Sequence, residues 1–293
     1  MSEHNGLTAM LAASIVGVRR VIVSGRGQPP SARGIYDCLL RPVYKKAVMA
    51  QKITLVTNSA STVREYAAWL DVPPNRVGVV YNGVDVDEIL RERDREATAS
   101  HRRSLGITDS TIIVGSVFNA RREKRPQLWV EAAAAIARRV PDVAFVLVGG
   151  GRWMEEVASQ LPALGLEGRL HRPGIRKDVA TWLELMDVVL LTSELEGTPN
   201  VLLEAQALGR PVVATDVGGC AETFLPEQTG ILLPTHPSAE EVAEAVTRIL
   251  NDRGFMERAN DEGSVFIRER YCAKRMAAEL TTLCFARSDR RPL

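Results

Sequence analysis

Short apolar runs alternate with amphipathic stretches through the middle of this sequence. Between Thr111 and Leu233, runs such as TIIVGSVF, AFVLVGG and DVVLLTS are apolar almost throughout, which is typical of strands that are buried on both faces. The stretch Pro126–Arg139, between the first two runs, has the periodicity of an amphipathic helix. This alternation predicts an α/β fold in which helices cover both faces of a parallel sheet.

The first ninety residues show the same alternation on a smaller scale. We expect strands at VIVS, ITLVTNS and VGVVYNG, and helices over Leu7–Gly17, Ile35–Gln51 and Thr62–Leu70. The segment Arg91–Arg103 is dense in charge and has no apolar run, so it is expected to be a linker that can be helical. The sequence thus predicts a small first domain (1–90), a linker (91–108), a larger second domain (109–268) and a final helical segment (269–293) that can cross back to the first.

Composition excludes several classes of function. The chain has 37 Lys and Arg and 36 Asp and Glu, which gives a formal net charge of +1. A net charge this small creates no electrostatic field that would favour nucleic acid or acidic partners. The four cysteines, Cys38, Cys220, Cys272 and Cys284, show no C-x-x-C spacing, so reduced thiols in the cytoplasm are expected rather than a zinc site or disulfides. No apolar run could span a bilayer, and no basic residues precede Leu7–Val18 as in a secretory signal. We expect a protein that is soluble, or at most peripheral at a membrane.

An anion site is predicted where a loop meets a helix near position 200. Thr198 suits an N-cap, Pro199 suits a first helical position because it lacks an N–H group, and Gly209 suits the helix end. The amides of Asn200 and Val201 then face the loop at the positive end of the helix dipole, where a phosphate can bind.

Two carboxylates flank this predicted anion site, Glu196 in the loop and Glu204 about one turn into the helix. Carboxylates accept strong hydrogen bonds from the hydroxyls of a sugar or a ribose. An isolated pair of Glu residues at this spacing is more often a solvated loop residue and a surface helix residue. The Thr-Pro start, the Gly stop, the apolar strand PVVAT and the turn Gly218-Gly219 favour the site instead.

The run E-G-T-P-N-V-L-L-E, followed by A-L-G-R-P-V-V-A-T-D-V-G-G-x-x-E, resembles the nucleotide-sugar site of retaining GT-B glycosyltransferases, the "glycosyl transferases group 1" family. The resemblance implies two Rossmann-like domains. It also implies that Glu204 holds the nucleotide ribose, that Glu196 and the adjacent Gly197 lie against the donor sugar, and that the amides of Asn200 and Val201 hold the diphosphate.

A basic loop, FNARREKRP over residues 118–126, follows the first strand of the second domain. Positive side chains at the start of a helix suit a diphosphate, and Arg125 is counted among the residues that bind it. In the family an Arg and a Lys neutralise the leaving diphosphate. Lys124 matches the Lys. Asn119 stands at the Arg position and is counted among the diphosphate-binding residues, where it can donate a hydrogen bond but carries no charge; whether Arg121 or Arg122 reaches over is left open. The alternative is an ordinary solvated basic loop.

Two glycine-containing turns extend the resemblance, and a third does not. Gly174 and Arg176, with Asp178 nearby, resemble the family's loop beside the nucleotide base. The turn Gly218-Gly219 resembles a loop near the sugar, although a plain turn explains it nearly as well. The run Gly149–Gly151 does not fit G-x-G-x-x-G and predicts a tight turn.

The sequence has four histidines, which are the next candidates for a site. His4 is the only candidate for the family's sugar-contacting His, but a frayed terminus is the favoured interpretation, and His101, His171 and His236 are expected in the linker or on the surface. No cluster has metal-ligand spacing, so neither a metal nor another cofactor is expected.

The predicted helix 35–51 has a basic face. This face carries Arg41, Lys45 and Lys52, and the opposite face carries Leu39, Leu40, Val43 and Ala47. Such a face can touch anionic lipid, although a solvated face over a core is the more common case.

The resemblance implies a transferase that moves a sugar from a nucleotide diphosphate sugar to a glycan or lipid-linked acceptor, with retention, in polysaccharide or glycoconjugate biosynthesis. The first domain, on the acceptor side, is smaller than in the family, so the start at Met1 is expected to be a truncation, a fragment edge or a misassigned start. Two alternatives stay open: a nucleotide-sugar-binding fragment or partner subunit without transferase activity, and an epimerase of the same fold. The epimerase needs catalytic carboxylates in the first half, where no such cluster occurs.

Overall fold

The computed structural model describes residue 18 and residues 21–29 and 37–285. The chain forms two compact units, which we call unit 1 (Met1–Gly83 with Ala273–Leu293) and unit 2 (Val84–Cys272). The predicted helix Leu7–Gly17 and His4 lie outside the described residues.

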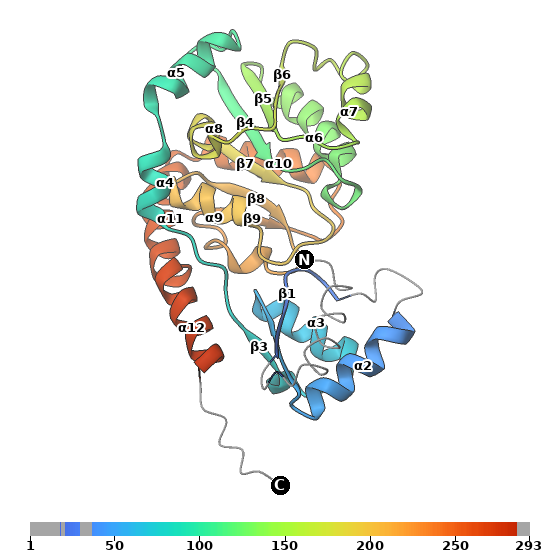
Figure 1. The fold of residues 1–293 in the computed structure, drawn as a ribbon. Helices are drawn as coiled ribbons and strands as arrows, with labels where there is room; N and C mark the ends of the chain where they lie inside the picture. The colour runs from blue at the N-terminus through green and yellow to red at the C-terminus, as the bar shows by residue number, and fades with distance from the viewer. Residues whose placement is uncertain (1–17, 19–20, 30–36, 286–293) are drawn as a thin grey trace. The chain divides into compact units, whose positions relative to one another are not determined.

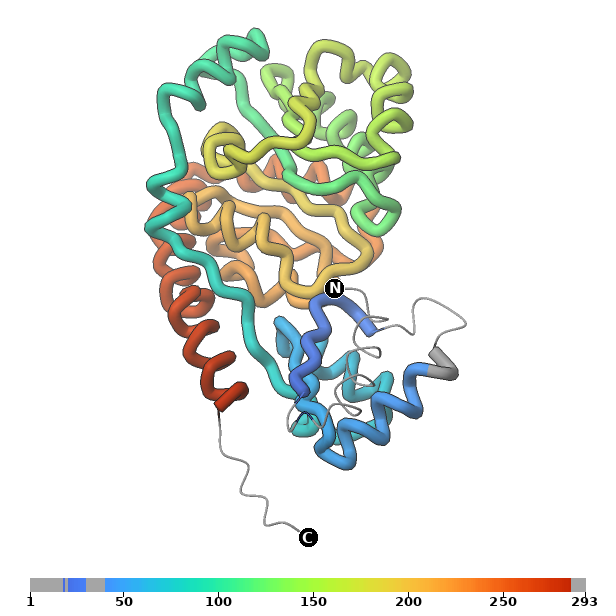
Figure 2. The backbone as a smooth tube through the Cα atoms, in the orientation of Figure 1, coloured from blue at the N-terminus to red at the C-terminus, as the bar shows by residue number. Residues whose placement is uncertain are grey.

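Unit 2 is built on a parallel sheet of six strands in the order β6-β5-β4-β7-β8-β9, which can be followed in Figures 1 and 2. The strands are β4 (Ile112–Val117), β5 (Val143–Val148), β6 (Leu170–Gly174), β7 (Val188–Leu191), β8 (Val212–Thr215) and β9 (Gly230–Leu233). The chain adds β5 and β6 on one side of β4 and then returns to add β7 on the other. The strand order therefore reverses between β4 and β7, and such a switch point is where open α/β sheets bind ligands.

Helices cover both faces of this sheet, as the apolar strands predicted (Figure 1). Side chains alternate along each strand, so Val188 packs with α6 (Pro126–Arg139) and α10 (Ala239–Asn251), whereas Val189 packs with α8 (Val179–Leu185) and α9 (Asn200–Ala207). The remaining helices are α4 (Val86–Glu92), α5 (Arg95–Ser104), α7 (Met154–Gln160) and α11 (Arg253–Arg270). The predicted bounds of α6 match the structure at both ends.

The segment expected to be a linker is instead part of unit 2. Asp85 and Asp94 cap α4 and α5, because their side chains accept hydrogen bonds from the amides of Glu88 and Ala97. Helix α5 then packs through His101, whose ring stacks on Trp182 of α8 at a centroid distance of 4.2 Å. The helix has no buried apolar stripe, which is why the apolar pattern did not reveal this packing.

Unit 1 contains a parallel sheet in the order β1-β2-β3 (Figure 1). Its elements are β1 (Val21–Gly25), α2 (Asp37–Met49), β2 (Ile53–Thr57), α3 (Ala60–Leu70), β3 (Val77–Val79) and α12 (Ala273–Phe285). Helix α12 belongs here because Gly83 lies against Ala273 and Met276, and the Arg275 guanidinium lies 5.3 Å from the centre of the Tyr81 ring.

The basic helix of unit 1 differs in part from its prediction. Leu40 and Ala47 of α2 are buried, but Val43 is 41% exposed. The buried face of the helix runs through Leu40, Tyr44, Ala47 and Val48, a spacing of four, three and one residues that leaves Val43 outside it. Lys45 forms an ion pair with Asp71 at 2.6 Å. Among the described residues no helix has both the length and the apolar character needed to cross a membrane.

Candidate active site at the strand switch point

The loops that follow β4 and β7 are bonded to each other at the switch point. The amide of Glu194 donates to the carbonyl of Glu123 over 2.7 Å, and the Thr192 hydroxyl donates to the carbonyl of Lys124 over 3.2 Å. Both loops start at the carboxyl ends of neighbouring strands. The tertiary structure therefore brings together the basic loop and the Glu196 loop, which the sequence presented as separate motifs.

Lys124 and Glu196 form an ion pair where these loops meet. The ammonium group of Lys124 donates a hydrogen bond to Oε1 of Glu196, and the side chains are only 22% and 10% exposed. Ser193 donates a second hydrogen bond to the same oxygen over 2.7 Å. The carbonyl of Ser193 in turn accepts from the hydroxyl of Thr215, at the end of β8, over 2.5 Å. Two side chains therefore hold the same oxygen of Glu196, and Thr215 in turn anchors the backbone of one of them.

The turn Gly218-Gly219 is packed directly against the Glu196 loop. Gly218 has φ +53°, and a Cβ atom there would lie 2.2 Å from the carbonyl oxygen of Glu196. The Gly219 amide donates to the Gly197 carbonyl over 2.6 Å. The turn thus needs glycine because the two backbones touch, which a plain surface turn would not require.

Helix α9 begins beside this loop, one residue later than expected. Pro199 is the N-cap, with an extended ψ of 112°, and the helix starts at Asn200. Thr198 is therefore not the cap, and no side chain makes a capping hydrogen bond. The positive end of the helix dipole still lies at Asn200 and Val201, as the anion-site prediction requires.

Glu204 lies one turn further along α9 and is largely buried. Desolvation raises the pKa of its carboxyl group, and the nearby charge of Glu92 on α4 raises it further. No hydrogen-bond donor to this carboxylate is found among the described residues. A buried carboxylate is costly unless donors reach it, and the hydroxyls of a ligand are suitable donors.

Asn119 is exposed and lies against the glycine turn after β5. A Cβ atom on Gly151, at φ +119°, would lie 2.3 Å from Oδ1 of Asn119, and the Ala120 amide donates to the Gly150 carbonyl over 2.6 Å. The glycines therefore form a tight turn, as predicted, which allows the β4 and β5 loops to touch.

The other cations of the basic loop have contacts of their own. Arg121 lies 3.9 Å from Glu123 and is largely exposed. The guanidinium of Arg125 donates to the Thr235 carbonyl over 2.7 Å and lies 2.8 Å from Nδ1 of His236. Its described contacts thus link the basic loop to the segment after β9 and do not reach the Lys124–Glu196 pair.

The loop after β6 is held by contacts that the sequence did not predict. Gly174 has φ +78°, and its carbonyl accepts from the Gly149 amide over 2.9 Å. Arg176 donates twice to Asp178, over 3.1 and 3.3 Å. Partial burial raises the pKa of Asp178, but the hydrogen bonds from Arg176 and His101 outweigh it and lower this pKa to about 2. His101 is thus a partner of this loop rather than a linker residue.

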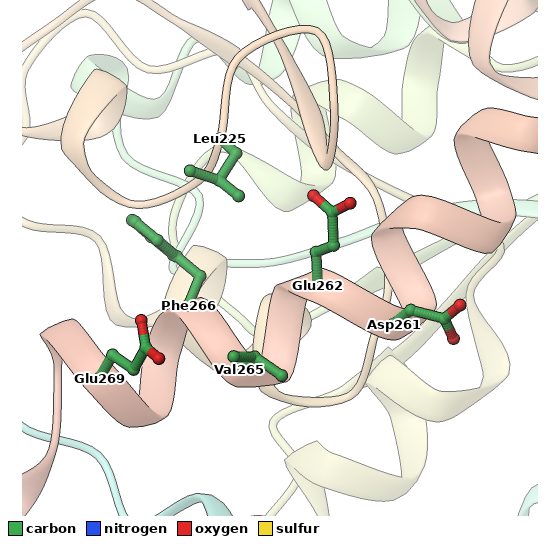
Figure 3. A pocket seen from close by; sticks show the side chains of 6 residues that line it. All are labelled: Leu225, Asp261, Glu262, Val265, Phe266 and Glu269. Atoms are coloured by element: carbon green, nitrogen blue, oxygen red, sulfur yellow. The ribbon is translucent and has the colours of Figure 1, made fainter.

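A separate pocket lies between α11 and the loop at Leu225 (Figure 3). Phe266 and Glu262 rise from α11 towards Leu225, and Val265, Asp261 and Glu269 complete the lining. Three carboxylates do not suit a diphosphate, and none of the predicted site residues lines this pocket. Within the described part of the chain, no group of three or more His, Cys, Asp or Glu side chains could hold a metal ion.

Comparison with known proteins gives a family match and relatives. A sequence model of the family described as "Glycosyl transferases group 1" matches residues 97–264. The Vi polysaccharide biosynthesis protein VipC/TviE of Salmonella typhi is 34% identical over 232 residues, which cover 78% of this chain and 39% of that protein. A D-inositol 3-phosphate glycosyltransferase of Corynebacterium urealyticum is 29% identical over 72% of this chain and 52% of its own length. The chain thus spans about half or less of the length of these relatives.

Among solved structures, Anabaena HepE in complex with UDP-glucose matches with a TM-score of 0.81. The identity is 22%, and the match covers 94% of this chain and 76% of that one. At this identity the likeness concerns the fold, and it shows that the parallel sheets described above are those of a GT-B protein.

Proposed function

Because the chain belongs to the glycosyl transferases group 1 family, we propose that it moves a sugar from a nucleotide diphosphate sugar to a glycan or lipid-linked acceptor. The observation that carries this proposal is the Lys124–Glu196 pair at the switch point, beside the first turn of α9. It combines a cation for a diphosphate, a carboxylate for sugar hydroxyls and a helix N-terminus in one place.

The donor is proposed to be a UDP-sugar, which the UDP-glucose complex of HepE supports. Its diphosphate would lie against Lys124 and the amides of Asn200 and Val201. Glu204 would accept hydrogen bonds from the ribose hydroxyls, and Gly174 and Arg176 would border the base. The polysaccharide role suggested by the name of VipC/TviE, a cytoplasmic location and peripheral membrane contact belong to the same proposal.

The chemistry is cleavage of the bond between the anomeric carbon of the sugar and the oxygen of the β-phosphate. Negative charge develops on the departing diphosphate, and a cation with backbone donors that are already in place stabilises it. The Lys124 ammonium can bridge Glu196 and the diphosphate, so the ion pair holds the cation ready. We propose that the acceptor oxygen bonds to the anomeric carbon on the face that the diphosphate leaves and that its proton passes to the departing phosphate oxygen, which retains the anomeric configuration, and that no metal takes part.

The proposal is tested by calorimetric titration of the complete chain with UDP and GDP in the absence of metal, followed by a product assay with the matching sugar nucleotide. Saturable binding of UDP and release of UDP with a glycosylated product are expected, and binding of GDP alone would overturn the choice of a UDP-sugar. Absence of binding to both would refute the donor site.

One observation favours a second candidate, a chain that binds a nucleotide sugar and transfers nothing. Asn119 stands where the resembled family has a cationic Arg, and its side chain lies against Gly151. A missing charge at the diphosphate weakens stabilisation of the leaving group. Nucleotide binding without product in the same assay would identify this candidate, and an isomerised sugar would identify the epimerase.

A further inference from the structure

The nearly neutral chain is strongly polarised between its two units. Unit 1 has 15 Lys or Arg against 6 Asp or Glu, a formal +9, and unit 2 has 22 against 30, a formal −8. The balanced total of +1 therefore conceals a basic unit that attracts anions. The expectation from composition that no field favours acidic partners is wrong for unit 1.

Arg26 places one of these cations at the ligand-binding edge of the small sheet. It directly follows β1, and β1 and β3 flank β2. Nη1 of Arg26 donates to Oδ1 of Asn82, beyond the end of β3, over 3.0 Å. The guanidinium thus bridges the carboxyl ends of the outer strands, and ligands of parallel sheets bind at this edge.

The guanidinium is anchored but not neutralised. Its partner Asn82 is an uncharged amide, and no carboxylate pairs with Arg26 among the described residues. Glu65 of α3 forms a hydrogen bond with Gln28, and burial raises its pKa; Arg26 is not among the charges that lower this pKa. Arg26 is exposed and keeps most of its five N–H donors, in the planar fork that fits a carboxylate or a phosphate.

We propose that unit 1 carries an anion-binding site centred on Arg26, and that it takes a carboxylate or phosphate group of the acceptor. That this anionic group belongs to the acceptor rests on the proposed function, whereas the anion site itself rests on the charge and contacts of unit 1 alone. The charge of the whole unit raises the local concentration of anions, and Arg26 provides the directed contact.

The test is ligand-observed NMR titration of the complete chain with D-glucuronate and with inorganic phosphate, at low ionic strength. Saturating UDP keeps phosphate out of the donor site, and D-glucose is the uncharged comparison. Arg26→Gln is compared with Arg76→Gln, which removes the same charge from an exposed position just before β3, at the opposite edge of the sheet. Arg26→Lys, which keeps the charge, serves if Arg26→Gln fails to fold.

We expect glucuronate, phosphate or both to bind and glucose not to bind. Arg26→Gln should lower the affinity for the anion by about tenfold or more. Arg76→Gln should change it by less than about twofold because it acts only through the screened field. If only glucuronate binds, the group that the site takes is a carboxylate. If only phosphate binds, the group is a phosphate. Equal losses in both variants or equal binding of glucose would overturn the proposal. So would a chain that binds neither anion in solution but binds phosphatidylglycerol vesicles in a separate sample.

The same samples separate this site from the proposed function. If the wild-type chain fails to bind UDP by calorimetry, the donor assignment fails, while glucuronate binding that depends on Arg26 still supports the anion site. If UDP binds equally to the wild type and to Arg26→Gln but neither anion binds, the anion site is refuted and the donor site stands.

Discussion

Lys124 and Glu196 are 72 residues apart in sequence, and their side chains meet in an ion pair at the switch point of the larger sheet. Each follows a different strand, and β4 and β7 become neighbours only because the chain reverses direction across the sheet. The pair is shielded on both sides, since neither side chain is more than 22% exposed. A cation held in this way would need little rearrangement to bind the diphosphate of the proposed donor.

Lys124→Met should therefore reduce the transfer rate by about 10²-fold or more, the cost of removing one preorganised charge from a developing anion. This loss is measured as the rate of nucleotide release at a saturating concentration of the donor sugar nucleotide. Arg121→Gln, a largely exposed cation of the same loop, is the control and should stay within a few-fold of wild type. Equal losses in the two variants would mean that the loop acts only through its general charge.

Glu204→Gln should weaken UDP binding by roughly 1–2 kcal/mol, because it replaces a charged acceptor of the ribose hydroxyls with a neutral one that makes weaker hydrogen bonds. Calorimetric dissociation constants for UDP provide the measurement. Glu244→Gln, on the exposed face of α10, removes the same charge elsewhere in unit 2. An unchanged constant for Glu204→Gln would remove Glu204 from the ribose site.

The same substitution should stabilise the ligand-free protein at neutral pH. Burial and Glu92 raise the pKa of Glu204 in the folded state, so ionising it costs folding free energy above that pKa, and this cost disappears as the pH falls below it. Melting temperatures should thus be higher for Glu204→Gln than for wild type at pH 7 to 8. The difference should shrink towards the acid side, and a difference that does not vary with pH would contradict the assigned cause.

Gly218→Ala should destabilise unit 2 and impair donor binding together. Its φ of +53° disfavours alanine, and the new Cβ atom would lie 2.2 Å from the Glu196 carbonyl oxygen. Gly165→Ala is a matched control, since Gly165 has φ +66° but no atom within 4 Å of the same Cβ position. The free energy of unfolding, measured by chemical denaturation, should fall by about 1 kcal/mol in the control and by clearly more in Gly218→Ala. Equal costs would show that the loops can move apart freely.

Asn119→Arg should raise UDP affinity or the transfer rate if the missing charge limits the diphosphate site. A charged hydrogen bond to phosphate contributes about 1.5–3 kcal/mol. The position is exposed, so the longer side chain has room. Calorimetry and the product assay on the variant measure the gain. Asn119→Gln, which adds length without charge, is the control, and a similar gain from it would argue against the role of the charge.

Much of the fold could be predicted because its signals are local. The buried strands of unit 2 are continuous apolar runs, and α6 has its apolar residues at helical spacing, so both follow from residues a few positions apart. The errors also have local causes. Pro199 suits an N-cap as well as a first helical residue, and α5 packs through one aromatic stack between His101 and Trp182 that no apolar periodicity reveals.

The α/β class, most helices and strands, and the motif that carries Glu196, Glu204 and the helix N-terminus follow from the amino-acid sequence, because neighbouring residues along the chain encode them. The contact between Lys124 and Glu196, the packing of Gly218 against the same loop and the bridge that Arg26 makes between β1 and β3 became visible only in the folded chain. The fold also sets which segments share a unit, and so reveals the +9 and −8 behind a total of +1. These properties depend on strand order and on chain crossings, which bring distant segments together without any periodic trace in the sequence.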